Sequence, residues 1–155
     1  MQLRYFNQPH FENGSLKLIS QVLKEHGISK PLICTDPGLV KIGMTDKIRN
    51  LISNELSPTF YTETPANPTE QAVNDALEIY KQNDCDGVVG FGGGSSMDLA
   101  KTVALMANHE GNVVDYSVNE GGTGKIKETV PTIAIPTTSG TGSEVSLGAV
   151  IIMND

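Results

Sequence analysis

Apolar positions along this chain follow two patterns that alternate from one end to the other. Spacings of three and four residues predict helices around residues 16–23, 48–52 and 72–80. Short, almost wholly apolar runs predict buried strands at residues 31–35, 59–61, 87–91 and 132–135. Strands separated by helices of this length predict an α/β fold with a doubly wound, mainly parallel sheet flanked by helices.

The helix around residues 72–80 has a well-marked start. Asn67 is a good N-cap, Pro68 suits the first helical position, and Glu70 has capping-box spacing from Asn67. These residues predict that the helix begins directly after Asn67.

The most informative stretch joins the apolar run at residues 87–91 to a helix predicted over residues 95–107. Gly92, Gly93 and Gly94 lie consecutively between them. Glycines let backbone N–H groups approach a ligand, and the helix start adds a partial positive charge. The turn therefore predicts a phosphate-binding site for a nucleotide or a phosphorylated cofactor. The alternative is a tight turn that needs glycine only for its positive φ.

This turn departs from the usual dinucleotide-binding fingerprint, although the predicted fold is Rossmann-like. Gly90 and Gly92 match the first two glycines of G-x-G-x-x-G, but Ser95 stands where the third belongs. The acidic residue of that fingerprint follows the turn by about 20 residues. Here the suitable residue, Asp36, precedes it.

Two aspartates each allow two interpretations. Asp36 ends a predicted strand, where its carboxylate can accept both hydroxyls of an adenine ribose and repel a 2′-phosphate, which favours NAD over NADP. It can equally cap a helix that starts at Pro37. Asp98 has capping-box spacing from Ser95, and it can equally contact the ligand.

Three polar or glycine-rich loops follow predicted strands, after Thr35, Phe91 and Ile135. Ligands of doubly wound sheets bind at the carboxyl ends of the strands, so these loops define one expected site. The third loop, residues 136–144, is rich in hydroxyls and glycine. It suits a phosphate or a nicotinamide ribose, or it is an ordinary polar loop.

Composition narrows the function classes. The 155 residues fit one domain, 1–155, and the net charge of −7 makes nucleic acid an unexpected partner. No apolar run approaches the roughly 20 residues of a membrane span. Cys34 and Cys85 do not indicate a disulfide framework, so a cytoplasmic location is expected.

Two other signatures are incomplete. Residues 121–125 resemble half a P-loop, but Asn119 and Ile126 replace its first glycine and its Ser/Thr. An exposed loop is therefore predicted over residues 119–127. The three histidines lack ligand-spaced partners, so no local metal site is predicted.

Four segments together resemble the N-terminal half of the iron-containing (group III) alcohol dehydrogenases, from about residue 11 to residue 155. They are TDPGLV at 35–40, NPT at 67–69, GGGSSMDLAK at 92–101 and IPTTSGTGSEV at 135–145. The last two are specific, and the order and spacing of all four fit the family.

The resemblance implies NAD as cofactor and assigns its contacts by position. Asp36 would hold the adenine ribose, and Asp98 and Asn67 would lie near the nicotinamide. The implied pyrophosphate residues are Gly93, Gly94 and Ser95, and the rest of the site is lined by Thr137, Thr138, Thr141 and Ser146. The implied reaction is hydride transfer between an alcohol or polyol and NAD, with a divalent metal, iron or zinc, polarising the oxygen.

Members of this family carry a second, helical domain in which one Asp and three His bind the metal, and this chain ends before it. No residue here is therefore expected to bind metal or to be catalytic, and the chain alone is expected to bind NAD at best. The missing domain is an expected partner. The final apolar run, residues 145–153, is expected to be partly uncovered, which favours a homo-oligomer.

Two other functions are compatible with the sequence. One is a non-catalytic nucleotide-binding module that acts by association. The other is half of a dehydroquinate-synthase-like lyase that uses NAD transiently. The loop at residues 136–145 resembles the alcohol dehydrogenases more closely than the lyases, so the dehydrogenase is favoured.

Overall fold

A single parallel sheet organises the computed structural model, which describes residues 7–153, so the expected domain limits 1 and 155 lie outside it. Its strand order is β2-β1-β3-β4. The strands are β1 (Pro31–Cys34), β2 (Thr59–Tyr61), β3 (Gly87–Gly92) and β4 (Thr132–Pro136). Each lies within one residue of its predicted limits, and the predicted α/β fold is confirmed.

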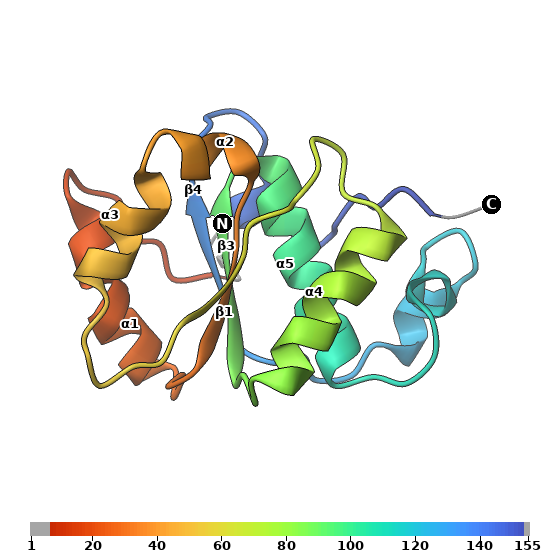
Figure 1. Ribbon diagram of the computed structural model, residues 1–155. Helices are drawn as coiled ribbons and strands as arrows, with labels where there is room; N and C mark the ends of the chain where they lie inside the picture. Colours follow the sequence, from red (N-terminus) through yellow and green to blue (C-terminus); the bar gives the residue numbers. More distant parts are fainter. Residues whose placement is uncertain (1–6, 154–155) are drawn as a thin grey trace, which may run out of the picture.

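Helices cover both faces of the sheet (Figure 1). On one face lie α1 (Ile19–Glu25), which follows a 3-10 turn at Ser15–Leu18, and α3 (Met44–Leu51). On the other face lie α4 (Glu70–Gln82) and α5 (Gly94–Ala107), and the short α2 (Pro37–Lys41) follows β1.

Two apolar cores, one on each face, hold these layers together. Ile33 and Val89 belong to the core under α1 and α3, whereas Leu32 and Val88 belong to the core under α4 and α5. Successive strand residues point to opposite faces, so β1 and β3 are buried on both sides. This explains why both strands read as continuous apolar runs rather than as alternating ones.

The strand order places the reversal of chain direction across the sheet between β1 and β3. The chain leaves β1 through α2 and α3 on one face toward β2, and it leaves β3 through α5 on the other face toward β4. The carboxyl ends of these two adjacent strands therefore form the topological switch point, where doubly wound sheets bind ligands.

The start of α4 differs from the prediction, and the Asn67 cap is wrong. Thr69 is the N-cap, and its hydroxyl accepts a hydrogen bond from Ala72 N at 3.2 Å. Ile152 N donates to Pro68 O at 2.8 Å, and Glu70 N donates to Ile152 O at 2.9 Å. This long-range pairing keeps the chain extended through Thr69, so the helix begins at Glu70.

The C-terminal third is mostly irregular, with 3-10 turns η2 (Val113–Tyr116), η3 (Gly122–Lys125) and η4 (Ser143–Val145). The predicted exposed loop at 119–127 contains η3. The expected uncovered run is confirmed in part, since Val145, Leu147 and Val150 are 62%, 78% and 77% exposed. Within residues 7–153, no helix is long and apolar enough to cross a bilayer.

Candidate cofactor-binding site

The turn from β3 into α5 presents bare backbone at the switch point. A Cβ on Gly92, at φ +155°, would lie 2.5 Å from Ser96 Oγ, so this position requires glycine. Gly93 is the extended N-cap of α5 and makes no side-chain cap bond. The first N–H groups of a helix have no partner within it, so α5 offers them to an anion.

Close packing of α5 on β3 fixes where those N–H groups point. A Cβ on Gly90 would lie 2.7 Å from Met97 Cα, so only glycine lets the helix approach the strand this closely. Ser96, Met97, Leu99 and Ala100 are buried in this contact region of α5. The helix start is therefore held rigidly at the carboxyl edge of the sheet.

The loop after β4 lies over the glycine turn. A Cβ on Gly93 would lie 3.6 Å from Thr138 Oγ1, and a Cβ on Gly94 would lie 3.3 Å from Thr141 Cβ. Segments more than forty residues apart in the sequence therefore bring two threonines onto the two glycines predicted to bind phosphate. The arrangement places hydroxyl groups beside free backbone donors.

Asp36 caps α2, which confirms one of its two interpretations. Leu39 N donates to Asp36 Oδ1 at 3.1 Å, and Pro37 occupies the first turn of the helix. The other oxygen, Oδ2, lies 3.2 Å from the place where a Cβ of Gly92 would be. The carboxylate thus faces the glycine turn, and its ribose contact stays a prediction.

The predicted capping box of Ser95 and Asp98 is wrong. Ser95 Oγ donates to Ala66 O instead. Asp98 accepts hydrogen bonds from Ser143 Oγ at 2.5 Å and from Val150 N at 3.0 Å. Because α5 begins at Gly94, Asp98 lies beyond its first turn and meets donors from the C-terminal segment rather than the helix end.

A small cavity of about 250 Å³ gathers half of the predicted site residues. Its lining includes the predicted residues Asn67, Gly94, Ser95, Asp98 and Thr141. Pro68, Ser143, Val150 and Ile152 complete it. Since Asp36, Gly93 and Thr138 lie at the adjoining turn, eight predicted residues fall in one neighbourhood.

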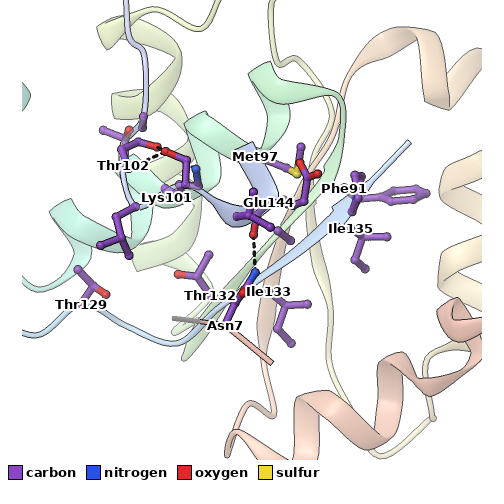
Figure 2. A pocket seen from close by; sticks show the side chains of 18 of the residues that line it. Asn7, Phe91, Met97, Lys101, Thr102, Thr129, Thr132, Ile133, Ile135 and Glu144 are labelled. Atoms are coloured by element: carbon purple, nitrogen blue, oxygen red, sulfur yellow. Dashed lines mark hydrogen bonds between the residues drawn. The ribbon is translucent and has the colours of Figure 1, made fainter. Parts of the chain in front are cut away.

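Thr137 and Ser146 do not line the small cavity but a second hollow, a broad open groove beside β4. Thr137 N donates to Gly92 O at 2.8 Å, which extends the pairing of β4 with β3, and Ser146 Oγ accepts from Gly148 N at 3.1 Å. Figure 2 shows side chains along this groove, including Ile133 and Ile135 of β4.

Comparison with known proteins identifies the family. The family model described as iron-containing alcohol dehydrogenase matches residues 7–155. This chain belongs to the iron-containing alcohol dehydrogenase family. The resemblance noted in the sequence is confirmed.

Two curated relatives illustrate the likeness. The chain is 43% identical over 152 residues to 4-hydroxybutyrate dehydrogenase of Cupriavidus necator, covering 97% of this chain and 40% of that protein. It is 40% identical over 139 residues to choline dehydrogenase of Bacillus subtilis, covering 89% and 35%. The chain therefore spans about two fifths of the length of such relatives.

Solved structures agree on the fold. Sulfoacetaldehyde reductase from Bifidobacterium kashiwanohense, solved with NAD+, superposes with a TM-score of 0.78 at 32% identity, covering 94% of this chain and 39% of that one. Alcohol dehydrogenase from Oenococcus oeni gives a TM-score of 0.82 at 26% identity, covering 92% and 37%.

The sequence analysis of this iron-containing alcohol dehydrogenase family member assigned no role to two polar residues, Lys101 and Ser143. Lys101 Nζ donates to Ser143 Oγ at 2.9 Å and to Gly148 O at 2.8 Å. Asp98 and Lys101 have the i, i+3 spacing of a helix-surface pair, which was the available signal. The long-range partner Ser143 left no local signal.

Two buried hydroxyls were also missed. Thr35 and Thr64, at 0% and 1% exposure, have Oγ1 atoms without a hydrogen-bond partner in residues 7–153. Thr64 N donates to Thr35 O at 3.2 Å, so both residues lie just beyond the carboxyl ends of β1 and β2. Buried hydroxyls without a hydrogen-bond partner are uncommon in folded proteins.

The chemistry of the described residues fits a dinucleotide and does not fit a metal. Uncapped N–H groups at α5 suit a pyrophosphate, and the Asp36 carboxylate beside them suits a ribose. In contrast, residues 7–153 hold no group of three or more His, Cys, Asp or Glu that could bind a metal ion.

Proposed function

We propose that this chain binds NAD and forms the cofactor-binding part of a metal-dependent alcohol dehydrogenase. The observation that carries the proposal is the uncapped start of α5, with Gly93 and Gly94 facing Thr138 and Thr141. The complex of sulfoacetaldehyde reductase with NAD+, which shares this fold at 32% identity, supports it.

The proposed roles follow the geometry. The N–H groups of Gly94 and Ser95 bind the pyrophosphate, and Asp36 binds the adenine ribose while it caps α2. Asn67 and Asp98, which line the cavity beyond the helix start, lie toward the nicotinamide end. When bound, NAD supplies the hydride acceptor, and these residues bind and orient it.

We propose a small alcohol or aldehyde as the substrate of the whole enzyme. The names 4-hydroxybutyrate dehydrogenase, choline dehydrogenase and lactaldehyde reductase among the relatives support this class. Because the described residues do not fit a metal, we assign them no catalytic step. The 155 residues alone are proposed to bind NAD without oxidising an alcohol.

Two further properties belong to the same proposal. A cytoplasmic location is supported by the two cysteines, Cys34 and Cys85, which are unpaired and buried. A homo-oligomer is supported by the exposed apolar side chains of Val145, Leu147 and Val150.

Calorimetric titration of NAD and NADP tests the binding role. We expect saturable NAD binding and at least about tenfold weaker NADP binding, because the Asp36 carboxylate repels a 2′-phosphate. Asp36→Ser keeps a capping side chain but removes the charge, so it should reduce the difference between the NAD and NADP affinities. Asp75→Ser, at an exposed position of α4, is the matched control and should leave both affinities unchanged. Absence of NAD binding by the native chain contradicts the proposal.

A complementation assay separates the dehydrogenase from the lyase and from a non-catalytic module. The matching family favours the dehydrogenase. Adding the C-terminal remainder of the Cupriavidus necator relative, with iron or zinc, should yield net NADH from a simple diol or hydroxy acid. NAD binding without net NADH in the complemented enzyme supports the other two functions.

A further inference from the structure

An ion pair on α5 ties the C-terminal segment to the helix. Asp98 and Lys101 lie 3.4 Å apart, with side chains only 15% and 17% exposed. Together they make four hydrogen bonds to residues 143–150, through Ser143 Oγ, Gly148 O and Val150 N. Each partner lies more than forty residues further along the chain.

The ammonium group of Lys101 has its full set of acceptors. A lysine carries three N–H donors, and these meet Ser143 Oγ at 2.9 Å, Gly148 O at 2.8 Å and Asp98 Oδ1 at 3.4 Å. Lys101 is therefore committed to the protein itself rather than to a phosphate or a substrate.

The carboxylate of Asp98 is almost as fully used. It has about four lone-pair positions, and three of them meet Ser143 Oγ, Lys101 Nζ and Val150 N. One position is left for a ligand in the cavity that Asp98 lines. Asp98 thus contacts both the cavity and residues 143–150.

The tethered residues 143–150 belong to a longer segment, residues 138–150, which has little regular structure of its own. Residues 138–150 contain only the three-residue turn η4, and most of them are exposed. Within the described chain, Asn7 and Lys101 donate hydrogen bonds to these residues, and Asp98 accepts hydrogen bonds from them. The same segment carries Thr138 and Thr141, which face the glycine turn.

We propose that Lys101 is a positioning residue for the cofactor site. Paired with Asp98, it clamps residues 143–150 onto α5 and thereby holds Thr138 and Thr141 over Gly93 and Gly94. The clamp acts on the pyrophosphate side of the site and leaves the Asp36 side untouched. This inference rests on the proposed NAD-binding function.

The test compares Lys101→Met with the native chain and with Lys47→Met. Methionine keeps much of the apolar stem but removes the charge and all three donors. Lys47, an exposed residue of α3, is the matched control. Hydrogen exchange measured without cofactor should show the Val150 amide and residues 138–148 exchanging about 10- to 100-fold faster in Lys101→Met alone. If these amides exchange in Lys101→Met at the same rates as in the native chain, Lys101 does not clamp the segment.

Ligand titrations then separate positioning from general damage. Lys101→Met should weaken ADP-ribose binding about tenfold or more while leaving adenosine binding unchanged, because only the pyrophosphate lies under the threonines. An equal loss for both ligands means a general structural role and overturns the proposal. Ser143→Ala removes one partner of the clamp and provides a milder second variant if Lys101→Met does not fold.

Failure of the proposed function would look different from failure of the clamp. If the native chain binds neither ligand, the NAD proposal fails, yet the exchange measurement still reports on the clamp. If the native chain binds both ligands and Lys101→Met binds them equally well, the positioning role of Lys101 is wrong and the NAD proposal stands.

Discussion

Asp86 fastens the beginnings of the two central strands to each other. Its carboxylate accepts hydrogen bonds from Ser29 N at 2.9 Å, Ser29 Oγ at 2.6 Å and Lys30 N at 2.8 Å. Partial burial raises the pKa of Asp86, but the hydrogen bonds from Ser29 and Lys30 outweigh it. The pKa therefore lies below its ordinary value of 3.8.

Asp86→Asn should destabilise the fold in a pH-dependent way. The folded pKa is lower than the unfolded one, so the stabilisation is fully present above about pH 4 and is lost as the pH falls through the folded pKa. We expect a loss of about 1–3 kcal/mol at pH 7 in urea unfolding, and a smaller loss at pH 3. Asp84→Asn is the control, since Asn suits its φ of +48°. A loss of equal size at both pH values contradicts this account.

The Cys34 thiol should not react with disulfide reagents in the folded protein. Burial, with a smaller contribution from Cys85, raises the pKa of this fully buried thiol far above its ordinary value. The thiolate is the reactive form, so a Cys85→Ala variant should not react with a disulfide reagent at pH 8 until urea unfolds it. Rapid labelling of the native variant would show that β1 opens locally.

Close approach of two elements, rather than the identity of any one side chain, sets the geometry of the cofactor site. The carboxyl half of β3 and the first turns of α5 pack with no side chain between them at Gly90. Because the helix start is the proposed anion site, the spacing of strand and helix determines where its N–H groups lie.

Gly90→Ala should therefore be far more damaging than Gly93→Ala. The first places a Cβ 2.7 Å from Met97 Cα, and the helix must move to accept it. The second meets Thr138 Oγ1 at 3.6 Å, an ordinary contact. We expect Gly90→Ala to cost about 1–3 kcal/mol or more in chemical unfolding, and Gly93→Ala much less. Similar unfolding midpoints for the two variants would contradict this packing argument.

The elements themselves were predictable because each carries its own pattern. Fully buried β1 and β3 read as apolar runs, and α4 shows the stripe of a helix packed on one face. Helix starts were less predictable. Asn67 and Thr69 are both good caps, and the choice depends on Ile152, more than eighty residues later. No local pattern carries that information.

The places of the candidate site residues in the fold were predictable to the same extent. The turn is indicated by three consecutive glycines, Gly92, Gly93 and Gly94, and the end of β1 is indicated by Asp36. The capping interpretation of Asp98 is wrong, although Ser95 offered a local partner at the right spacing. Its actual partners, Ser143 and Val150, reach it only through the fold of the C-terminal segment.

On the scale of the whole molecule, the exposed apolar run at its C-terminal end should govern association. Leu147→Glu should shift sedimentation toward smaller species, because it places a charge on a side chain that is 78% exposed within this run. Ile42→Glu, on a 70% exposed side chain after α2, is the control and should have no effect. If the native chain is monomeric at all concentrations, the proposed homo-oligomer is wrong.

The strand order also determines when each strand can pair during translation. Among the strands of residues 7–153, β1 is synthesised first, yet it lies in the interior of the sheet between β2 and β3. One edge of β1 stays unpaired until β3 is synthesised. By the pairing of Pro31 with Gly87, β3 begins 56 positions later. At about 5–20 residues per second, translation leaves that apolar edge unpaired for about 3–11 seconds. During this period the unpaired edge of β1 can pair with another nascent chain on the same mRNA.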